Sequence, residues 1–377
     1  MPEAFIDPHP LVLALFILFA SCFFFQMVYL WAVLFRVGKG KDAVYPGNEP
    51  GVSVVICAHN EYLNLQEKLP LILSQDYPEY EVIVVNHASD DDTGFLLTGL
   101  ADHYPRLKIV DIPNDRNFFT GKKFPLSIGI KSARYEQVLL TDADCRPAGD
   151  QWIRSMASAF RDKQEIVLGY GAYEKLPGFL NQMIRFDAAA VAMQFLSYAL
   201  AGIPYMGVGR NLAYLKSLFY RHNGFISHYR IRSGDDDLFV NRVARKRNTT
   251  VMLSPSSFTY SNPKRTLGKW ITQKKRHFST SVYYRPVHKF LLGFWSLTLV
   301  LFWISLVILL SIRFAWIIVL GMLLLMLVSR YIVLGRWMAR LREKDLIWIA
   351  PFLELLLLLL NGSVFFSNLV KKPVRWK

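Results

Sequence analysis

The stretch Val138-Leu139-Leu140-Thr141-Asp142-Ala143-Asp144-Cys145 runs from an apolar strand pattern straight into two carboxylates that are one residue apart. Open α/β sheets bind ligands at the carboxyl ends of their strands. Carboxylate oxygens are the ligands that Mg²⁺ and Mn²⁺ prefer. The stretch therefore predicts a buried strand whose end holds such a cation, unless Asp142 is only a turn former after the strand.

The rest of the chain has the composition of a membrane protein. Of its 377 residues, 53% are hydrophobic. Leu11 to Phe35 carries no charge and exceeds the roughly 20 residues that a transmembrane helix needs. No basic residue precedes this segment, which argues against a cleaved signal peptide. We therefore expect residues 1–37 to contain an amino-terminal transmembrane helix.

Two further apolar blocks, Phe290 to Leu310 and Phe314 to Leu334, are separated by three residues and predict a helical hairpin over 290–334. A last apolar segment, 346–370, is either a full span or a re-entrant or interfacial element. It contains residues that are unusual in a simple span, namely Pro351, Glu354, Asn361 and Gly362. We expect residues 290–377 to form a carboxyl-terminal membrane region.

Basic residues near the apolar segments predict the orientation. Arg36, Lys39 and Lys41 follow the first segment, and Arg285 and Lys289 precede the second, which places residues 38–289 in the cytoplasm. A full last span would move the basic tail outside, so re-entry is favoured. The chain is thus expected to be a multi-pass protein of the cell membrane.

The net charge of +15, from 44 Lys and Arg against 29 Asp and Glu, fits anionic lipid headgroups and nucleotide phosphates. We recognise no nucleic-acid-binding module in the sequence. Protein partners cannot be inferred from it. The three cysteines, Cys22, Cys57 and Cys145, lack disulfide or metal spacing and suit a reducing compartment.

Residues 38–289 read as one α/β domain. Strands are predicted at Val52 to Cys57, Glu81 to Val85, Leu107 to Ile112 and Gln137 to Leu140, with helical patterns between them. Strands that alternate with helices predict a mainly parallel sheet, with the site in the loops at its carboxyl edge.

Six motifs in order then resemble those of inverting, membrane-bound family 2 glycosyltransferases with the GT-A fold. They are SVVICAHNE from Ser53, VVNHASDDDT from Val84, GKKFPLSIGI from Gly121, TDADC from Thr141, SGDDDL from Ser233 and QKKRH from Gln273. The resemblance implies an α/β nucleotide-diphospho-sugar transferase domain. It also implies a nucleotide-sugar donor and a lipid-linked or membrane-proximal acceptor.

The same resemblance assigns the donor and metal residues. The nucleotide-sugar would contact Ala58, Asn60, Glu61, Asn86, Ser89, Lys122 and Asp142. Asp144, with Asp142, would hold Mg²⁺ or Mn²⁺, which stabilises the charge that grows on the departing diphosphate. Lys122 and Arg276 would add fixed positive charge, although either could instead be a solvated or headgroup-facing base.

Inversion needs a carboxylate that removes the proton from the acceptor hydroxyl as it attacks. The triplet Asp235-Asp236-Asp237 supplies candidates. Alignment on the acidic motif makes Asp235 the base, whereas alignment on Arg242 makes it Asp236, and both remain open. At least one of the three is expected only to cap the following helix, Leu238 to Arg245.

The acceptor or pyrophosphate side would be formed by two segments, which contribute Gly209, Arg210 and Asn211, and Gln273, Arg276 and His277. Leu180 to Leu200 predicts a long apolar helix, either interfacial or in the core. Two departures from the family pattern matter. Asn86-His87 replaces an acidic pair, which leaves the identity of the nucleotide base undetermined. His277 replaces a tryptophan that is typical of processive synthases.

These patterns predict a membrane glycosyltransferase that transfers one sugar with inversion. One alternative is a small processive β-glycan synthase, which product length would distinguish. Another is a catalytically silent membrane scaffold that has kept the fold, which donor hydrolysis would exclude.

Overall fold

A computed structural model of the chain describes residues 9–39, 49–113, 121–161, 163–231 and 233–370. A mixed sheet lies at the centre of the α/β domain, with strand order β3-β2-β1-β4-β8-β6-β9. Its strands are β1 (Val52–Ala58), β2 (Tyr80–His87), β3 (Leu107–Ile112), β4 (Gln137–Asp142), β6 (Ile166–Leu168), β8 (Leu212–Leu215) and β9 (Thr249–Val251). β3, β2, β1 and β4 are parallel, and β8 is antiparallel to both of its neighbours. The mainly parallel α/β fold is confirmed.

Strands β1, β2 and β4 are found where predicted because each is a largely apolar run that the sheet buries on both faces. β3 is an edge strand, and its Lys108 and Asp111 are exposed. β4 continues two residues further than predicted and ends at Asp142, so the first carboxylate belongs to the strand itself. Helices cover the sheet: α2 (Tyr62–Leu73), α3 (Thr93–His103), α4 (Lys123–Ser132), α5 (Trp152–Ala157), α7 (Lys216–Arg221) and α8 (Asp237–Val243). Gly129 brings α4 close to the sheet, since a Cβ there would lie 2.5 Å from Val55 Cγ1.

A small second sheet continues the chain after the two carboxylates. It has the order β5-β10-β7, with β5 (Cys145–Pro147), β10 (Thr259–Ser261) and β7 (Gly171–Tyr173). β10 is antiparallel to β5 and parallel to β7. This sheet lies beside the end of β4 and joins the segment after Asp144 to the segments that lead into the membrane-side helices.

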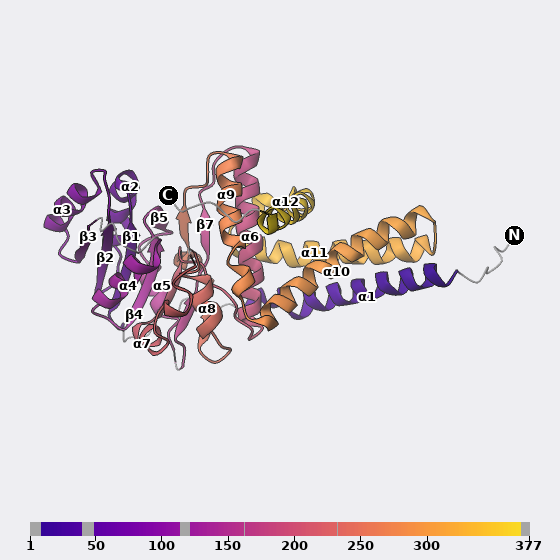
Figure 1. Cartoon of the computed structure of the whole chain (residues 1–377), viewed down its shortest axis with the longest axis horizontal. Helices are drawn as coiled ribbons and strands as arrows, with labels where there is room; N and C mark the ends of the chain where they lie inside the picture. The colour runs from indigo at the N-terminus through magenta and orange to yellow at the C-terminus, as the bar shows by residue number, and fades with distance from the viewer. Residues whose placement is uncertain (1–8, 40–48, 114–120, 162, 232, 371–377) are drawn as a thin grey trace.

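Three long helices project from the domain in one direction, as Figure 1 shows: α1 (Pro10–Ala32), α10 (Pro286–Ser311) and α11 (Trp316–Arg340). The α10–α11 hairpin agrees with the predicted one. The start of α1 and the α10–α11 turn lie at the end of the bundle that is far from the domain. Gln26 of α1 donates to Thr298 Oγ1 of α10 at 2.8 Å, and Phe19 stacks on Phe302 with 5.1 Å between ring centroids.

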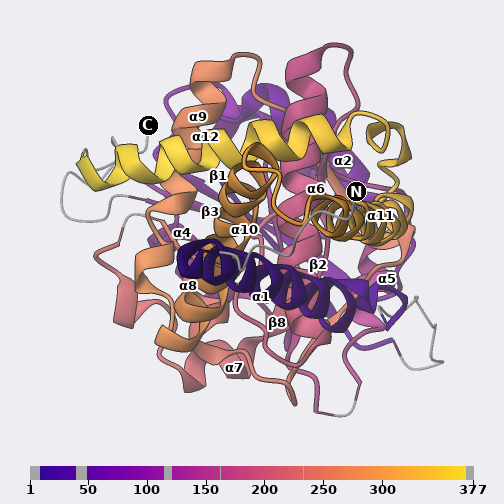
Figure 2. The same ribbon diagram turned by 90° about the vertical axis from the view of Figure 1, so that its right-hand side faces the viewer.

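Among the residues that the structure describes, four helices are long and apolar enough to cross a membrane: Pro10–Gly38, Pro286–Ser311, Trp316–Arg340 and Ala350–Asn368. The last belongs to α12 (Ala350–Val370), whose direction differs from the others. α12 is seen nearly end-on in Figure 1 and lengthwise in Figure 2, where α10 and α11 are seen end-on. α12 therefore runs across the bundle rather than along it.

α12 is continuous from Ala350 to Val370, so Asn361 and Gly362 do not interrupt the helix. Pro351 lies in its first turn, where a missing amide hydrogen leaves no helical bond unmade. α12 packs beside α9 (Leu267–Phe278). Lys275 Nζ donates to Ser367 Oγ at 2.8 Å, and Asn368 Nδ2 donates to the Lys275 carbonyl at 2.9 Å.

α6 (Phe179–Leu200) stands with α9 between the sheet and the bundle in Figure 1. Lys274 of α9 forms an ion pair with Asp187 of α6 at 2.6 Å. α6 buries part of its surface in the core, including Phe186 and Phe195, while Phe179 and Val191 are exposed.

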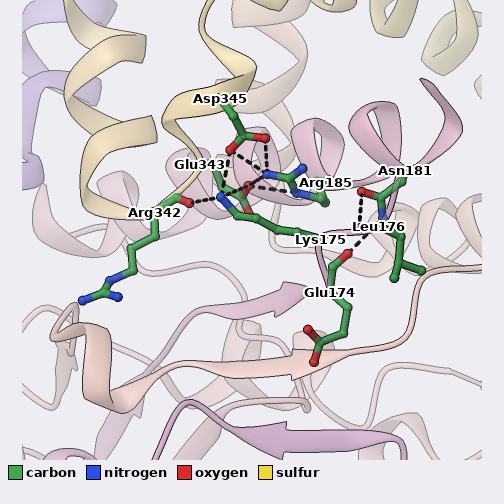
Figure 3. Close-up of polar contacts among 8 residues, drawn as sticks. All are labelled: Glu174, Lys175, Leu176, Asn181, Arg185, Arg342, Glu343 and Asp345. Atoms are coloured by element: carbon green, nitrogen blue, oxygen red, sulfur yellow. Dashed lines mark hydrogen bonds and ion pairs between the residues drawn. The ribbon is translucent and has the colours of Figure 1, made fainter. Parts of the chain in front are cut away.

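A buried ion-pair network ties α6 to the connection between α11 and α12 (Figure 3). Arg185 and Glu343 are 3% and 1% exposed and are ion-paired. The Arg185 guanidinium also donates to Asp345 Oδ2 at 2.7 Å. Lys175 Nζ reaches Asp345 Oδ1 at 2.8 Å and the Arg342 carbonyl at 2.7 Å. The network therefore holds the start of α12 against the α/β domain.

We expect Glu343→Ala to lower the free energy of unfolding by about 3 kcal/mol, because it leaves the buried Arg185 charge with only a half-exposed partner. Asp345→Ala is the matched control, since removing a carboxylate that is 46% exposed should cost about 1 kcal/mol or less. Thermal melts of the detergent-solubilised variants measure both. Equal losses would show that Glu343 has no special role.

Candidate active site

The two carboxylates at the end of β4 lie side by side at the carboxyl edge of the sheet. Single ligand atoms of Asp142, Asp144 and Cys145 lie within 4.8 Å of one another. Lys68 Nζ donates to the Asp144 carbonyl at 3.0 Å and so holds the turn. Burial and the neighbouring Asp142 charge raise the pKa of the Asp144 carboxyl.

These residues fit a hard divalent cation. A cation between the carboxylates would relieve the repulsion that raises the pKa of Asp144. Cys145 contributes no oxygen ligand, and burial raises the pKa of its thiol, which donates to Asp144 Oδ1 at 3.5 Å. The oxygen pair alone is therefore the candidate site for Mg²⁺ or Mn²⁺.

Lys122 joins the metal motif to the acidic triplet. It lies at the start of α4, forms an ion pair with Asp142, and its Nζ is 3.9 Å from Asp235 Oδ2. Burial lowers the pKa of an ammonium, but the two carboxylates outweigh it and raise the pKa of Lys122. With 20% of its side chain exposed, Lys122 is not the solvated helix-start lysine that was the alternative.

The two loops predicted to bind the nucleotide contact each other. The Asn60 amide donates to Ser89 Oγ at 3.0 Å, and the Asp90 amide donates to Asn60 Oδ1 at 2.8 Å. Ala58 and Glu61 line the cavity described below, whereas Asn60 and Ser89 do not. Asn60 and Ser89 therefore shape the loops rather than face the cavity.

Asn86 is not among the residues that line the cavity, and its Nδ2 donates to Asp111 Oδ1 at 2.8 Å. Its neighbour His87 lines the cavity with His59, whose Nδ1 lies 2.8 Å from the His87 carbonyl oxygen. Sequence reasoning missed both histidines and the cavity-lining Lys264. The replacement of an acidic pair by Asn86-His87 was the one signal that could have found His87.

The three aspartates of the triplet differ in their partners. Asp237 Oδ2 accepts from the hydroxyls of Thr280 and Tyr284, and its Oδ1 accepts from the Leu238 amide. Asp237 is only 7% exposed. Its bonds to Thr280 and Tyr284 hold α8 against the segment that follows α9. Asp237 is the first residue of α8, and the N-cap residue, whose side chain accepts from a backbone amide of the helix, is Asp236.

Asp236 is held by two backbone amides. Its Oδ1 accepts from Asp237 N at 2.7 Å, and its Oδ2 accepts from Gly209 N at 2.7 Å. Each oxygen keeps a free lone pair, and Asp236 lines the cavity. Burial, together with the charges of Asp235 and Asp237, raises the pKa of Asp236 to about 7.

Asp235 also lines the cavity but faces Lys122. The loop before it is anchored by Lys123, which sequence reasoning did not single out. Lys123 Nζ donates to the carbonyls of His228, Ile231 and Ser233. The second lysine of the GKK motif thus positions the acidic triplet, while the first contacts it.

The predicted acceptor loop is only partly in the cavity. Gly209 and Arg210 line it, and Arg210 Nη1 is anchored on Ser261 Oγ at 2.8 Å. Asn211 does not reach it: its side chain is 0% exposed and bonds to Trp152 and to the carbonyls of Tyr170 and Ser257. The expectation that Asn211 contacts ligand is not met, because its amide is fully used inside the core.

α9 brings Gln273, Arg276 and His277 to the cavity wall. Gln273 Nε2 donates to the Tyr173 hydroxyl at 3.2 Å. Among the described residues, no hydrogen-bond partner reaches Gln273 Oε1 or Arg276 Nε, although both atoms are buried. Burial and the adjacent Arg276 lower the pKa of His277 to about 3, so its ring is neutral at pH 7.

One cavity of about 1530 Å³ contains this site and extends into the membrane-side helices. At one end lie Asp142, Asp144 and the acidic triplet. At the other, α10, α11 and α12 contribute apolar walls, for example Leu299, Val333 and Leu357. The candidate metal ligands Asp142 and Asp144, the Asp236 carboxylate with its raised pKa, and the apolar residues of α10, α11 and α12 therefore line the same cavity.

The fold and this site define a membrane glycosyltransferase of the hexosyltransferase type with a GT-A domain. The resemblance seen in the sequence is confirmed at this level. The chain belongs to Glycosyl transferase family 21, whose sequence profile matches residues 13–377.

Relatives and solved structures agree with this assignment. Poly-beta-1,6-N-acetyl-D-glucosamine synthase of Staphylococcus epidermidis is 36% identical over 94 residues, which cover 25% of this chain and 22% of that enzyme. Probable glycosyltransferase YdaM of Bacillus subtilis is 26% identical over 257 residues, which cover 66% of this chain and 59% of that protein. The match thus spans about a fifth of the first relative and under two thirds of the second.

A mannosyltransferase from Pyrobaculum calidifontis, solved in complex with GDP-Man and Mn²⁺, is similar in structure with a TM-score of 0.57 and 20% identity. The similarity covers 91% of this chain and 98% of that one. At this identity, the likeness establishes the shared fold.

Proposed function

We propose that the protein transfers one hexose, with inversion, from a nucleotide-diphosphate donor to a hydroxyl of an amphiphile that lies in the membrane. The observation that carries this proposal is the continuity of the cavity from the carboxylates of β4 to apolar surface between α10, α11 and α12. A soluble acceptor would not require an apolar extension of the active site.

One face of α10 forms the wall of that extension. Its lining residues follow helical spacing and include Leu292, Trp295, Ser296, Leu299, Val300 and Trp303. Between the first and the last of them the helix rises by roughly 17 Å. This length of apolar wall fits a hydrocarbon chain, with the polar head of the amphiphile directed to the acidic triplet.

On the donor side, Lys122 and Arg276 place positive charge around the position that Asp142 and Asp144 define. Asp144, with Asp142, would hold Mg²⁺ or Mn²⁺, which supplies charge stabilisation for the departing diphosphate. The neutral His277 ring and the orphaned Arg276 Nε fit hydrogen-bonding groups of either substrate.

Asp236 is the best candidate for the base. The acceptor oxygen attacks the anomeric carbon, its proton passes to the Asp236 carboxylate, and the sugar–oxygen bond breaks with its electron pair on the nucleoside diphosphate. Two backbone amides orient Asp236, and its pKa of about 7 suits a general base at neutral pH. Asp235, facing Lys122, is better placed to contact the donor.

The processive alternative is kept because poly-beta-1,6-N-acetyl-D-glucosamine synthase is among the relatives. The lipid acceptor is favoured over it because the cavity continues between α10, α11 and α12 to apolar residues such as Leu299, Val333 and Leu357. Transfer assays decide between these functions. Purified protein in nanodiscs is incubated with labelled nucleotide sugars, Mn²⁺ and a total membrane-lipid extract.

We expect the label to enter the organic phase with one sugar per lipid. Long water-soluble products would instead establish the synthase. Absence of both transfer and donor hydrolysis across all donors would support the silent scaffold and refute the proposal.

A cytosolic donor can reach the site only if the α/β domain faces the cytoplasm, as the juxtamembrane basic residues predict. We expect a single cysteine at the exposed position Ser227, in a cysteine-free background, to resist an impermeant reagent in intact cells and to react after permeabilisation. A cysteine at Glu3, which lies outside the described residues, should react in intact cells. Labelling of position 227 in intact cells would reverse the orientation.

The same assay tests α12. A cysteine at Lys377, also outside the described residues, should stay unreactive in intact cells if α12 lies along the membrane surface. Its direction across the bundle supports that placement. Labelling at 377 but not at 227 would make α12 a full span and leave the donor argument intact.

A further inference from the structure

Three arginines come together where α8 meets the start of α10. Arg242 lies in the last turn of α8, Arg245 follows that helix, and Arg285 is the N-cap residue of α10. Arg245 Nη1 donates to the Arg242 carbonyl oxygen at 3.0 Å, and Arg285 Nη2 donates to the same oxygen. Two guanidinium groups thus meet at one oxygen atom. We call Arg242, Arg245 and Arg285 the arginine cluster.

No carboxylate of the described residues forms an ion pair with the arginine cluster. Arg242 Nη1 donates to Ser227 Oγ at 2.6 Å, and Arg245 Nη1 also donates to the Ala244 carbonyl at 2.8 Å. Burial and the Arg245 charge lower the pKa of Arg285. In the described part of the chain, a single nitrogen of each guanidinium makes these bonds. Most of the five N–H donors of each group are therefore available to an anion.

Capping of α8 is the structural alternative. The last carbonyls of a helix commonly accept from arginine side chains, and the helix dipole favours positive charge there. One guanidinium is enough for one carbonyl oxygen, however, and a second one adds repulsion. A bound phosphate offsets this repulsion, because its oxygens accept strong hydrogen bonds from more than one guanidinium group. The crowding of the cluster therefore points to an anion.

The cluster lies at the boundary between the domain and the membrane helices. The first turn of α10 is at the domain end of the bundle, opposite the α10–α11 turn (Figure 1). This turn carries Val287 and Phe290, which lie three residues apart on one helix face and are both exposed. Ile226, the neighbour of Ser227, is exposed as well. Positive charge thus lies beside apolar surface, as the headgroup and acyl chains of a phospholipid require.

We propose that the arginine cluster binds the headgroup phosphate of an anionic phospholipid, whose acyl chains lie against Val287 and Phe290. None of these residues lines the active-site cavity, so this lipid is neither the donor nor the acceptor, and the site does not depend on the proposed function. A zwitterionic lipid fits less well, because its own cation would enter the field of three arginines. The bound headgroup joins α8, which starts beside Asp236, to the membrane helix α10.

The test uses phosphatidylglycerol and phosphatidylcholine probes that carry a diazirine in the acyl chain, each added in trace amounts to phosphatidylcholine nanodiscs. Mass spectrometry quantifies the labelled peptides from the start of α10. We expect roughly tenfold stronger labelling of the wild type by phosphatidylglycerol, the scale of one hydrogen bond between charged groups. The ratio should fall toward one in Arg245→Gln and in Arg285→Gln.

Arg221→Gln is the control for a nearby charge. Burial and the charges of Arg242, Arg221 and Arg245 lower the pKa of His222, so Arg221 lies close to the cluster. It already pairs with Glu165 at 2.7 Å, and its loss should leave the labelling ratio at the wild-type value.

Arg336→Gln is the control for general attraction between basic residues and the membrane surface. Arg336 of α11 lies 4.5 Å above the Phe35 ring, near the end of α1 and away from the cluster. We expect this variant to keep the wild-type ratio at the start of α10. A loss as large as that of Arg285→Gln would show diffuse surface attraction and would overturn a defined site.

The remaining outcomes are equally decisive. Equal labelling of the wild type by both probes would refute the lipid site. Displacement of the phosphatidylglycerol label by inorganic phosphate would assign the cluster to a soluble anion instead. Thermal melts separate the capping role: a lower melting temperature of Arg245→Gln with an unchanged ratio would make the cluster a helix cap only. If Arg285→Gln fails to fold, Arg245→Gln gives the reading, because Arg245 is exposed.

Discussion

Asp144→Asn is expected to reduce sugar transfer by roughly 10²–10³-fold while the protein stays folded, the scale for removing one group that stabilises transition-state charge. The physical reason is that an amide cannot replace a charged cation ligand at this position, where one oxygen of Asp144 lies within 4.8 Å of one oxygen of Asp142. Transfer rates against Mn²⁺ concentration measure it, and thermal melts report folding.

Asp102→Asn is the matched control, because Asp102 is exposed on α3 and does not line the cavity. Its transfer rate should equal that of the wild type. The cation role would be refuted if the wild type stays active after complete chelation and Asp144→Asn is active as well.

Asp236→Asn should lower turnover by roughly 10²-fold or more with little change in the KM for the donor, as expected for loss of a general base. The wild-type rate should also fall as the pH drops below about 7. A raised pKa means that Asp236 is protonated below that pH and can no longer accept the hydroxyl proton. Turnover measured from pH 5 to pH 9 tests this.

Asp235→Asn provides the comparison, since it shares the triplet but faces Lys122. We expect it to raise the KM for the donor more than it lowers turnover at saturating donor. The reverse pattern would make Asp235 the base, which was the other alignment of the motif. Near-normal turnover in both variants would contradict base catalysis by the triplet.

The strands and the metal motif were accessible from the sequence for a local reason. A parallel strand that is buried on both faces must be an apolar run, so β1, β2 and β4 stood out without any partner. Asp142 and Asp144 follow such a run directly, and their closeness in space needs nothing beyond the turn that joins them. The helices α1, α10 and α11 could also be predicted locally, because each is an uninterrupted apolar segment that is long enough to cross a membrane.

The roles within the acidic triplet were not accessible in this way. Asp237 differs from Asp235 and Asp236 only through Thr280 and Tyr284, which lie 43 and 47 residues further along the chain. Asn211 failed as a ligand residue for the same reason, because Trp152, Tyr170 and Ser257 use its amide. Which lone pairs remain free depends on contacts that no local pattern records.

The last apolar segment illustrates what local sequence could predict and what depended on tertiary contacts. Hydropathy identified 346–370 as an apolar membrane segment. Local residue patterns identified the strands, the Asp142–Asp144 pair and the candidates for the base. Only the tertiary structure decided that α12 lies across the bundle, through its bonds to α9 and the network around Arg185. It also placed apolar residues of α10, α11 and α12 on the wall of the active-site cavity. The reason is that hydrophobicity and neighbouring ligands act over a few residues, whereas a cavity is made by surfaces that distant segments leave unfilled.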